Sequence, residues 1–421
     1  MLTRAQVTNI MQEVRREAIP LYNSENKLSK LLKTNRINEK VANWNGNKQL
    51  VIEGQGLHTG ALQGGLHTTS NIYLQNAAQA AVADAVTYNV AQYLYSLRYD
   101  WLLKKLKDTS GANMLKKQIK TAWASLNKMM NIAHYVGYAC QVCAKATNSP
   151  GGSSITIPAG TQINHLFEGL AVEFADSGQP GWNGSSGLNT GYYGIISTIT
   201  ENDNGTVTLA CVQSDLSTGA AFTAAHAEQP LYMLGSHNLL PYGMVDLYTK
   251  DNTIGSKTRT GRTNPISISA DDDKTIYEKP SMAIRNLKRR VNVRGNFKCD
   301  VVLIGSQTND FFYDKTFADR QRYPMDGEKT LLAMEPDWKV DKDLSVVVDP
   351  DMPEGVAIVM PSKNLWVAPL ADDEPDYMDS EEGGLRVPGQ AVGEIAIWHP
   401  MQMGLYDLGQ IGVLTDIEKY F

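Results

Sequence analysis

The chain has 421 residues, of which 42% are hydrophobic and 20% charged, so it can bury a sizeable core, and wholesale disorder is excluded. At ~150 residues per domain the length predicts two or three domains, and the formal net charge of −6 disfavours a protein dedicated to nucleic-acid binding. No apolar run approaches the ~18 to 20 residues of a membrane span. The N-terminus is charged where a signal peptide has its apolar core. Four cysteines are too few for a disulfide scaffold of this size and favour a reducing interior.

Charge is distributed unevenly along the chain. Residues 1–50 contain nine Lys or Arg and four Glu, and residues 101–150 contain eight Lys and one Asp. Residues 146–249 contain no Lys or Arg and are rich in small polar residues. This break predicts a separately folded module inserted into a host of different composition, with chance variation within one domain as the alternative. Residues 371–382 carry seven acids and no base, which is typical of a solvated loop.

The N-terminal part predicts a helix over Ala5–Glu17, a polar arm and then a long hairpin. Two strand-like runs, QLVIEG and SNIYLQ, lie within residues 47–76 and flank a tip rich in glycine. Such a hairpin is marginal in isolation because glycine loses much backbone entropy on folding. It therefore needs a surface to lie on, which a partner subunit can supply. The five glycines of the tip are Gly54, Gly56, Gly60, Gly64 and Gly65.

A strand and a long helix follow the hairpin. Residues 85–101 alternate and are rich in aromatic residues, as expected of a strand. After Gly111 apolar residues recur at helical spacing, and the absence of proline allows a helix to about Lys145. The stripe consists of Leu115, Ile119, Trp123, Leu126, Met130, Ala133 and Gly137. Lysines lie mainly off this stripe, either on an ordinary solvated face or on a face toward nucleic acid.

The base-free segment contains short β-prone runs, which predicts a small β-barrel or sandwich. Asn204-Gly205 between two of these runs predicts a two-residue hairpin turn. Further on, Pro280 is well placed to begin a helix. Buried-type strands are expected at 299–305, 344–350 and 355–361, and a sheet strand in the last segment.

No pattern of catalytic or ligand-binding residues is present. Gly54–Gly60 is a near miss to a dinucleotide-binding loop without the helix that should follow it. Cys140 and Cys143 form a C-x-x-C, but a zinc site needs two further ligands nearby, so we interpret both as small apolar residues on one helical face. The seven histidines show no ligand spacing, and residues 371–382 lack the EF-hand order. No catalytic residue, metal or cofactor is therefore expected.

The order of the parts is more informative than any single part. A basic arm, a glycine-tipped hairpin, an aromatic strand, a long helix, an inserted β-module, a mixed α/β region, an acidic loop and a closing strand follow one another. This order resembles the major capsid proteins of tailed bacteriophages, whose Hong-Kong-97-type fold is shared with the herpesvirus shell. VTYNVAQYLYSLRYDWLLKKLKD and VVVDPDMPEGVAIVMPSKNLWV also look like corresponding pieces of phage capsid sequences.

The resemblance implies an α+β fold with an N-arm, an E-loop, a P domain with a spine helix and an A domain, plus a small inserted β-barrel or sandwich domain. The implied divisions are an N-terminal arm (1–40), an E-loop (41–96), a P domain with spine helix (97–147), an inserted β-domain (148–238), a region that is mostly A domain (239–385) and a P-domain closing segment (386–421). The hairpin tip, with Gly54, Gly56, Gly60, Gly64 and Gly65, would contact neighbouring subunits. Lys116, Lys117, Lys120 and Lys128 would form a basic face toward the interior of a shell.

The implied function is structural and not enzymatic. The chain would self-assemble as hexamers and pentamers of an icosahedral phage head, hold packaged double-stranded DNA by non-specific electrostatics, and be located in the virion after assembly in the host cytoplasm. A portal, a decoration protein and a separate scaffolding protein are expected partners, the last because no coiled-coil prosegment is present; no membrane or cofactor is expected. Two alternatives remain, an encapsulin-like compartment shell and another phage structural protein of the decoration or tail type. An enzyme is a weak third.

Overall fold

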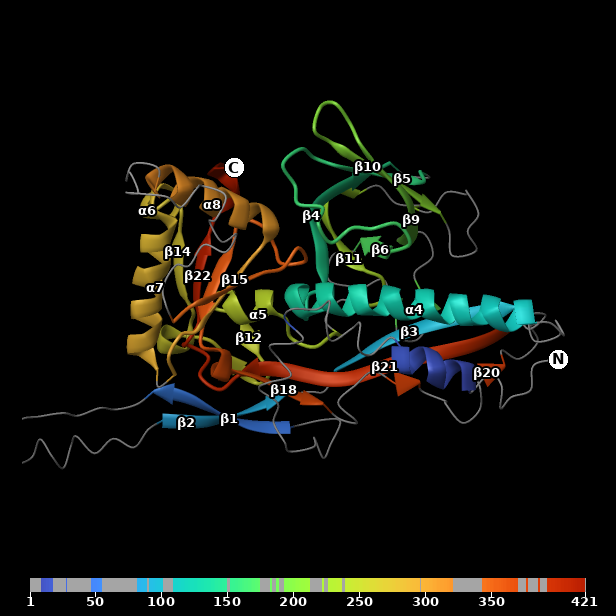
Figure 1. Ribbon diagram of the computed structural model, residues 1–421, viewed down its shortest axis with the longest axis horizontal. Coiled ribbons are helices and arrows are strands. Elements are labelled where there is room, and N and C mark those ends of the chain that lie inside the picture. The colour runs from blue at the N-terminus through green and yellow to red at the C-terminus, as the bar shows by residue number, and fades with distance from the viewer. Residues whose placement is uncertain are drawn as a thin grey trace, which may run out of the picture.

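The protein is a mixed α+β molecule in this computed structural model, as the sequence predicts (Figure 1). Its main parts are a long sheet crossed by a long helix, a closed barrel above that helix, a second sheet with its own helices, and a two-stranded ribbon. The structure describes residues 9–17, 28, 47–54, 82–88, 91–100, 109–149, 152–174, 182–183, 187–188, 193–212, 222, 226–236, 239–295, 297–320, 343–369, 376–377, 385–386 and 392–420.

The long sheet is organised around β21, the strand predicted for the last segment. It consists of β3 (Ala91–Asp100), β18 (Leu365–Pro369), β19 (Asp376–Tyr377), β20 (Leu385–Arg386) and β21 (Val392–Leu405). β21 pairs antiparallel with β3, with Val392 opposite Asp100 and Met401 opposite Ala91. Its last residues pair with β18. Segments from near both ends of the chain therefore build one sheet.

Helix α4 (Thr109–Val136) runs along this sheet, with the barrel on its other side (Figure 1). The predicted apolar stripe is buried, and Trp123 and Met130 are at most 1% exposed. Over the last two turns Asn131, His134 and Tyr135 are buried as well, so here the helix is covered on every side.

Helix α4 ends earlier than the sequence predicts. The helix was expected to reach about Lys145, but it ends at Val136 because Gly137 adopts φ +73°. A Cβ on Gly137 would lie 1.9 Å from Oδ2 of Asp246 and 2.3 Å from the backbone nitrogen of Gly243. Glycine is thus required for this close approach, and the chain turns directly into the first barrel strand.

The predicted β-module is a closed six-stranded barrel with the strand order β10-β5-β4-β11-β6-β9. Its strands are β4 (Gln141–Asn148), β5 (Ser154–Ile157), β6 (Ala171–Phe174), β9 (Tyr193–Glu201), β10 (Val207–Val212) and β11 (His226–Met233). Alternating residues of the strands fill it, as in β10, where Val207, Leu209 and Cys211 are buried. A separate two-stranded sheet joins β7 (Trp182–Asn183) and β8 (Gly187–Leu188).

The predicted hairpin at Asn204-Gly205 forms, but its turn is longer than two residues. Beyond the Glu201–Val207 pair, the amide of Asn202 donates to the carbonyl of Thr206 at 2.8 Å, which leaves residues 203–205 as the loop. The amide of Gly205 donates to the carbonyl of Asn202 at 2.9 Å, and in this loop only Gly205 has a positive φ. This is a three-residue loop with glycine in the left-handed position.

The second sheet has the order β14-β22-β17-β15-β16, in which β14 and β22, and β15 and β16, are parallel. Its strands are β14 (Ile266–Ser269), β15 (Val301–Ile304), β16 (Ser345–Val348), β17 (Ala357–Met360) and β22 (Gly412–Thr415). Helices α6 (Thr275–Glu278), α7 (Pro280–Arg294) and α8 (Ser306–Arg320) accompany it. The three strands predicted at 299–305, 344–350 and 355–361 and the helix from Pro280 are confirmed. Residues 386–421 contribute to both sheets, through β21 and β22.

A short connecting region joins the barrel to the second sheet. It contains α5 (Met244–Tyr248), β12 (Thr253–Ile254), β13 (Lys257–Thr258) and η2 (Gly261–Thr263), and η4 (Ser362–Asn364) and η6 (Ile417–Tyr420) lie further along the chain. The fully buried Arg259 donates to the carbonyls of Thr263 at 2.9 Å and Leu408 at 2.5 Å, which ties this region to the chain that leaves β21.

The predicted strand 85–101 is two strands. Its first part belongs to β2 (Val82–Tyr88), which pairs antiparallel with β1 (Asn47–Gly54), whereas β3 pairs with β21. The alternating pattern continues through the break, so the sequence gives no sign of the change of partner. The second predicted hairpin strand, SNIYLQ, lies outside the described residues.

Candidate assembly surfaces

The β1–β2 ribbon is a two-stranded sheet whose described strands pair only with each other. Among the described elements outside the pair, its main neighbour is η2. A two-stranded ribbon is at best marginally stable in water, so this one needs a further surface. Gly54 ends β1 opposite Val82, and the other predicted tip glycines, Gly56, Gly60, Gly64 and Gly65, lie outside the described residues.

Two of the four lysines predicted to face a shell interior form ion pairs within the chain. Residues 9–17 form a helix, within the predicted Ala5–Glu17, that lies beside α4. Lys116 Nζ lies 2.6 Å from Glu13 Oε1 and 3.5 Å from a carboxylate oxygen of Glu17, and Lys120 also pairs with Glu17. Its contact with Glu13 raises the pKa of Lys116. These two lysines hold the N-terminal helix.

The other two lysines have different surroundings. Lys117 is exposed and forms no ion pair within the described part of the chain. Lys128 Nζ lies 4.2 Å from the ring centroid of Phe167, in the barrel segment, which is a cation–π contact. The four lysines are therefore divided between the N-terminal helix, solvent and the barrel.

A chain of buried hydrogen bonds joins α4, the long sheet and the N-terminal helix. Trp123 donates from Nε1 to the hydroxyl of Tyr377 at 2.8 Å, and this hydroxyl donates to the carbonyl of Met11 at 2.9 Å. The two rings meet edge to face, with 5.7 Å between centroids. Arg15 also pairs with Asp376 at 3.3 Å. Buried polar groups of α4, β19 and the N-terminal helix thus satisfy one another.

Polar contacts also join the barrel to the second sheet. The side chain of Gln162 donates to the carbonyl of Glu354 at 2.6 Å and accepts from its amide at 3.2 Å, and Nε2 of His165 lies 2.7 Å from the carbonyl oxygen of Asp351. The Glu354 carboxylate accepts from the amides of Gln307 and Thr308 at the start of α8. These contacts fix the barrel relative to the sheet.

Two buried ionisable groups lie near the end of α4. The Asp246 carboxylate accepts from the amides of Tyr138 at 2.6 Å and Gly243 at 2.8 Å, yet burial raises its pKa to about 6. Burial lowers the pKa of His134 to about 4. In both side chains burial favours the neutral form, as expected in a packed interior.

The cysteines lie in the core. All four are buried and free, and burial raises the pKa of Cys211 and Cys299 to about 12 and that of Cys140 and Cys143 in the same direction. Cys140 lies just before β4 and Cys143 lies within it, so neither is on a helix, because α4 ends before them. Among the described residues no cluster of His, Cys, Asp or Glu is suited to a metal ion. None of the described helices combines the length and apolar character of a membrane span.

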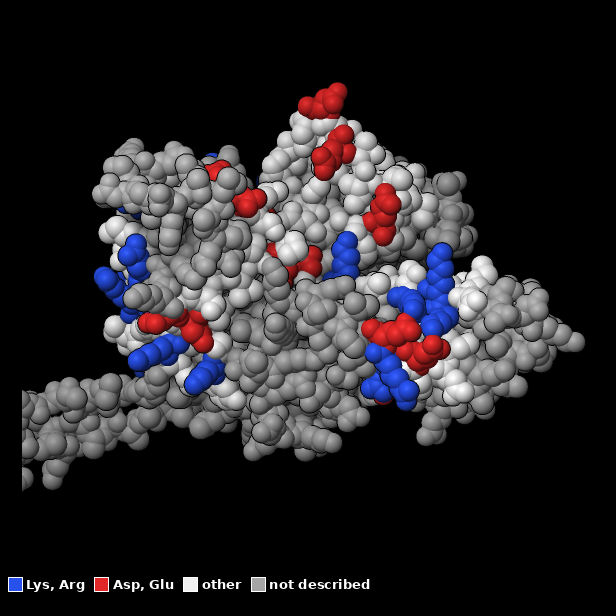
Figure 2. All heavy atoms as spheres, in the orientation of Figure 1, with Lys and Arg blue, Asp and Glu red and all other residues white. Residues whose placement is uncertain are grey.

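The predictions from sequence include the helix that begins at Pro280 but miss its basic character. The run IRNLKRRVNVR within α7 has five Lys or Arg and no acid. A local charge count over this run identifies it, but the acidic residues on either side hide it in longer windows. Figure 2 shows Lys and Arg side chains along the edge of the molecule that α7 forms.

No protein-family model and no curated protein sequence matches the chain. Among solved structures, a chain of the cyanophage A-1(L) capsid asymmetric unit is similar at 13% identity, covering 94% of this chain and 93% of that chain with a TM-score of 0.49. A chain of the satellite phage P4 procapsid including size determination protein has 10% identity, 94% and 98% coverage and a TM-score of 0.37. A chain of the capsid of the native GTA particle has 10% identity, 92% and 90% coverage and a TM-score of 0.44. All three are structures of phage or GTA capsids, the class of protein that the sequence also resembles.

Proposed function

We propose that the chain is a structural capsid protein of the Hong-Kong-97 type, which assembles into the hexamers and pentamers of an icosahedral phage head around double-stranded DNA. The order of its parts supports this proposal: a ribbon, a long helix, an inserted barrel, a mixed sheet and a long closing strand follow one another. Scaffolding, portal and decoration proteins would be its partners, and assembly would take place in the host cytoplasm.

The observation that carries the proposal is the β1–β2 ribbon. Its backbone is paired only within the ribbon among the described strands, and such a ribbon gains stability from a third strand or a packed face. In a closed shell each copy would supply that face to its neighbour. A contact between different surfaces of identical copies repeats from copy to copy and produces rings where the rotation closes.

Packaged DNA would meet lysines that form no ion pair within the described part of the chain. By this criterion Lys117 is better suited than Lys116 and Lys120, which pair with Glu13 and Glu17. The interior basic face of the proposal therefore depends on Lys117 more than on the other three. Charge reversal of Lys116, Lys117 and Lys120 that leaves genome packaging unchanged would exclude a role toward DNA.

The proposal is tested by expressing the chain with and without its genomic neighbours and imaging the product by electron microscopy. We expect closed shells or hexameric and pentameric rings. A monomer that never assembles under either condition would contradict the proposal. Shells that enclose protein cargo and no nucleic acid would favour the compartment alternative.

A further inference from the structure

Helix α7 has one buried face and one face that no described element covers. Ala283, Ile284, Leu287 and Val291 are at most 4% exposed and pack against the second sheet. On the opposite side apolar and basic residues follow one another at helical spacing. The residues of this outward face are Met282, Arg285, Asn286, Arg289 and Val293.

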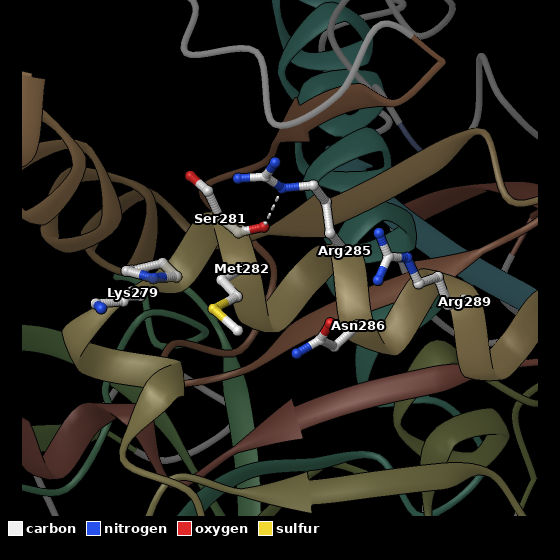
Figure 3. A pocket seen from close by; sticks show the side chains of 7 residues that line it. Lys279, Ser281, Met282, Arg285, Asn286 and Arg289 are labelled. Atoms are coloured by element: carbon white, nitrogen blue, oxygen red, sulfur yellow. Dashed lines mark hydrogen bonds between the residues drawn. The ribbon is translucent and has the colours of Figure 1, made fainter.

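The two arginines in the middle of the outward face form no ion pair within the described part of the chain. Arg285 donates from Nε to the carbonyl of Ser281 at 3.0 Å, which leaves its terminal nitrogens directed away from the helix (Figure 3). Neither Arg285 nor Arg289 forms an ion pair with a described acidic residue. By contrast, Arg294 donates to the carbonyls of Asn264 and Gly409 and has a structural role.

Both ends of the outward face are apolar. Val293 is 88% exposed and Met282 is 48% exposed, and they lie ~16 Å apart at 1.5 Å per residue. A hollow of about 400 Å³ lies along the first turns, lined by Met282, Arg285 and Arg289 among others (Figure 3). Apolar residues around a cationic centre suit a protein surface better than a nucleic-acid backbone, which offers phosphates but no apolar contact.

A complementary surface exists on the barrel. Residues 146–249 contain no Lys or Arg, and four carboxylates on the described barrel surface are exposed: Glu168, Glu201, Asp203 and Glu228. Figure 2 shows acidic side chains distributed over the barrel. The barrel and α7 lie apart in the molecule, and Gln162 and Glu354 help to fix the barrel in place (Figure 1). A barrel carboxylate therefore reaches the α7 of another copy more readily than its own.

We propose that the outward face of α7 docks on the acidic barrel surface of a second copy of this chain. Two different surfaces are joined, so the contact continues from copy to copy and is of the kind that forms rings. The inference rests on the proposed capsid function and names the two surfaces that would meet between neighbouring subunits. Because the docked groups carry opposite charge, the contact is expected to weaken with added salt.

The test is a charge swap measured by sedimentation and electron microscopy. Arg285→Glu with Arg289→Glu should lower the yield of shells or rings by about tenfold or more, because like charges would then face each other. Combining this pair with Glu201→Lys and Asp203→Lys, or with Glu168→Lys and Glu228→Lys, should restore assembly. The control, Lys250→Glu with Lys363→Glu, makes the same change of charge at exposed positions elsewhere and should assemble normally.

Each other outcome overturns the inference. Normal assembly of the Arg285→Glu, Arg289→Glu variant would show that the face is not an interface. Normal assembly with less packaged nucleic acid would assign the face to nucleic acid. Loss of assembly that neither barrel pair rescues would exclude the barrel as the partner. In these three cases the wild-type chain assembles and the capsid function stands, whereas a wild-type chain that never self-associates overturns both proposals.

Discussion

The two long amphipathic helices α4 and α7 both carry basic residues but are packed differently. α4 lies between the long sheet and the barrel, is buried on all sides near its end, and uses Lys116 and Lys120 to hold the N-terminal helix. α7 covers one face of its sheet and presents Arg285 and Arg289 outward. The difference indicates that a basic helix is a candidate interface only where its charges lack partners within the chain.

The largest expected effect tests whether α4 is the packed centre of the molecule. Trp123→Ala removes a side chain that is 1% exposed together with its hydrogen bond to Tyr377. We expect the free energy of unfolding to fall by about 3–5 kcal/mol in urea titrations of the unassembled chain. Ala124→Ser, at an exposed position of the same helix, should change it by less than about 1 kcal/mol. Equal effects of the two substitutions would contradict the assignment of α4 to the core.

The next effect is a pH dependence at the end of α4. Because the pKa of Asp246 is raised from 3.8 to about 6, the folded state binds more protons than the unfolded state between these values. This residue therefore makes the free energy of unfolding fall as pH rises from about 4 to 6, by at most about 3 kcal/mol. Asp246→Asn should remove that contribution, whereas the exposed control Asp272→Asn should retain it. An unchanged pH profile in Asp246→Asn would contradict the burial of this carboxylate.

A smaller effect on the free energy of unfolding concerns the glycine at which α4 ends. Two glycine substitutions distinguish the cost of a left-handed backbone from the cost of a close contact. Gly137 and Gly160 both have positive φ, but only at Gly137 would a Cβ overlap neighbouring atoms. Gly160→Ala should cost about 1 kcal/mol for the left-handed backbone alone. Gly137→Ala should cost about 1–3 kcal/mol more in the same unfolding experiment. Similar costs would show that the approach of Gly137 to Gly243 is not needed for folding.

The smallest effect on stability compares the charges of the two helices directly. Lys116→Glu with Lys120→Glu should release the N-terminal helix, seen as faster proteolysis within residues 9–17 and a small fall in Tm, because these lysines meet Glu13 and Glu17. Arg285→Glu with Arg289→Glu should leave Tm and the proteolysis pattern unchanged. If the α7 pair destabilised the chain as much as the α4 pair, the proposed division between structural and available charges would be wrong.

Elements whose residues form one local pattern could be predicted from sequence. The stripe from Leu115 to Ala133 and the strand around Val301 have this property, because periodicity reflects which face is buried. The end of α4 could not be predicted, because Gly137 also fits the stripe as a small residue, and only its approach to Gly243 shows why it must be glycine. The division of 85–101 depends on partners far away in the sequence.

The same distinction applies to the candidate surfaces. The glycine content around Gly54 indicates a hairpin that needs support, but the partner predicted for its first strand, SNIYLQ, is wrong, because β1 pairs with β2 further along the chain. The sequence could not show which lysines of α4 form ion pairs, since the partners Glu13 and Glu17 lie about a hundred residues away. The basic run of α7 was visible in the sequence, but its exposure was not.

Hydrogen–deuterium exchange of the ribbon, in the free subunit and in the assembled particle, tests the central claim most directly. If the ribbon is supported by a neighbouring copy, amides of β1 and β2 should exchange rapidly in the free subunit and become strongly protected on assembly, while β15 and β17 of the second sheet are protected in both states. Equal protection of the ribbon in the free subunit and in the particle would contradict the account.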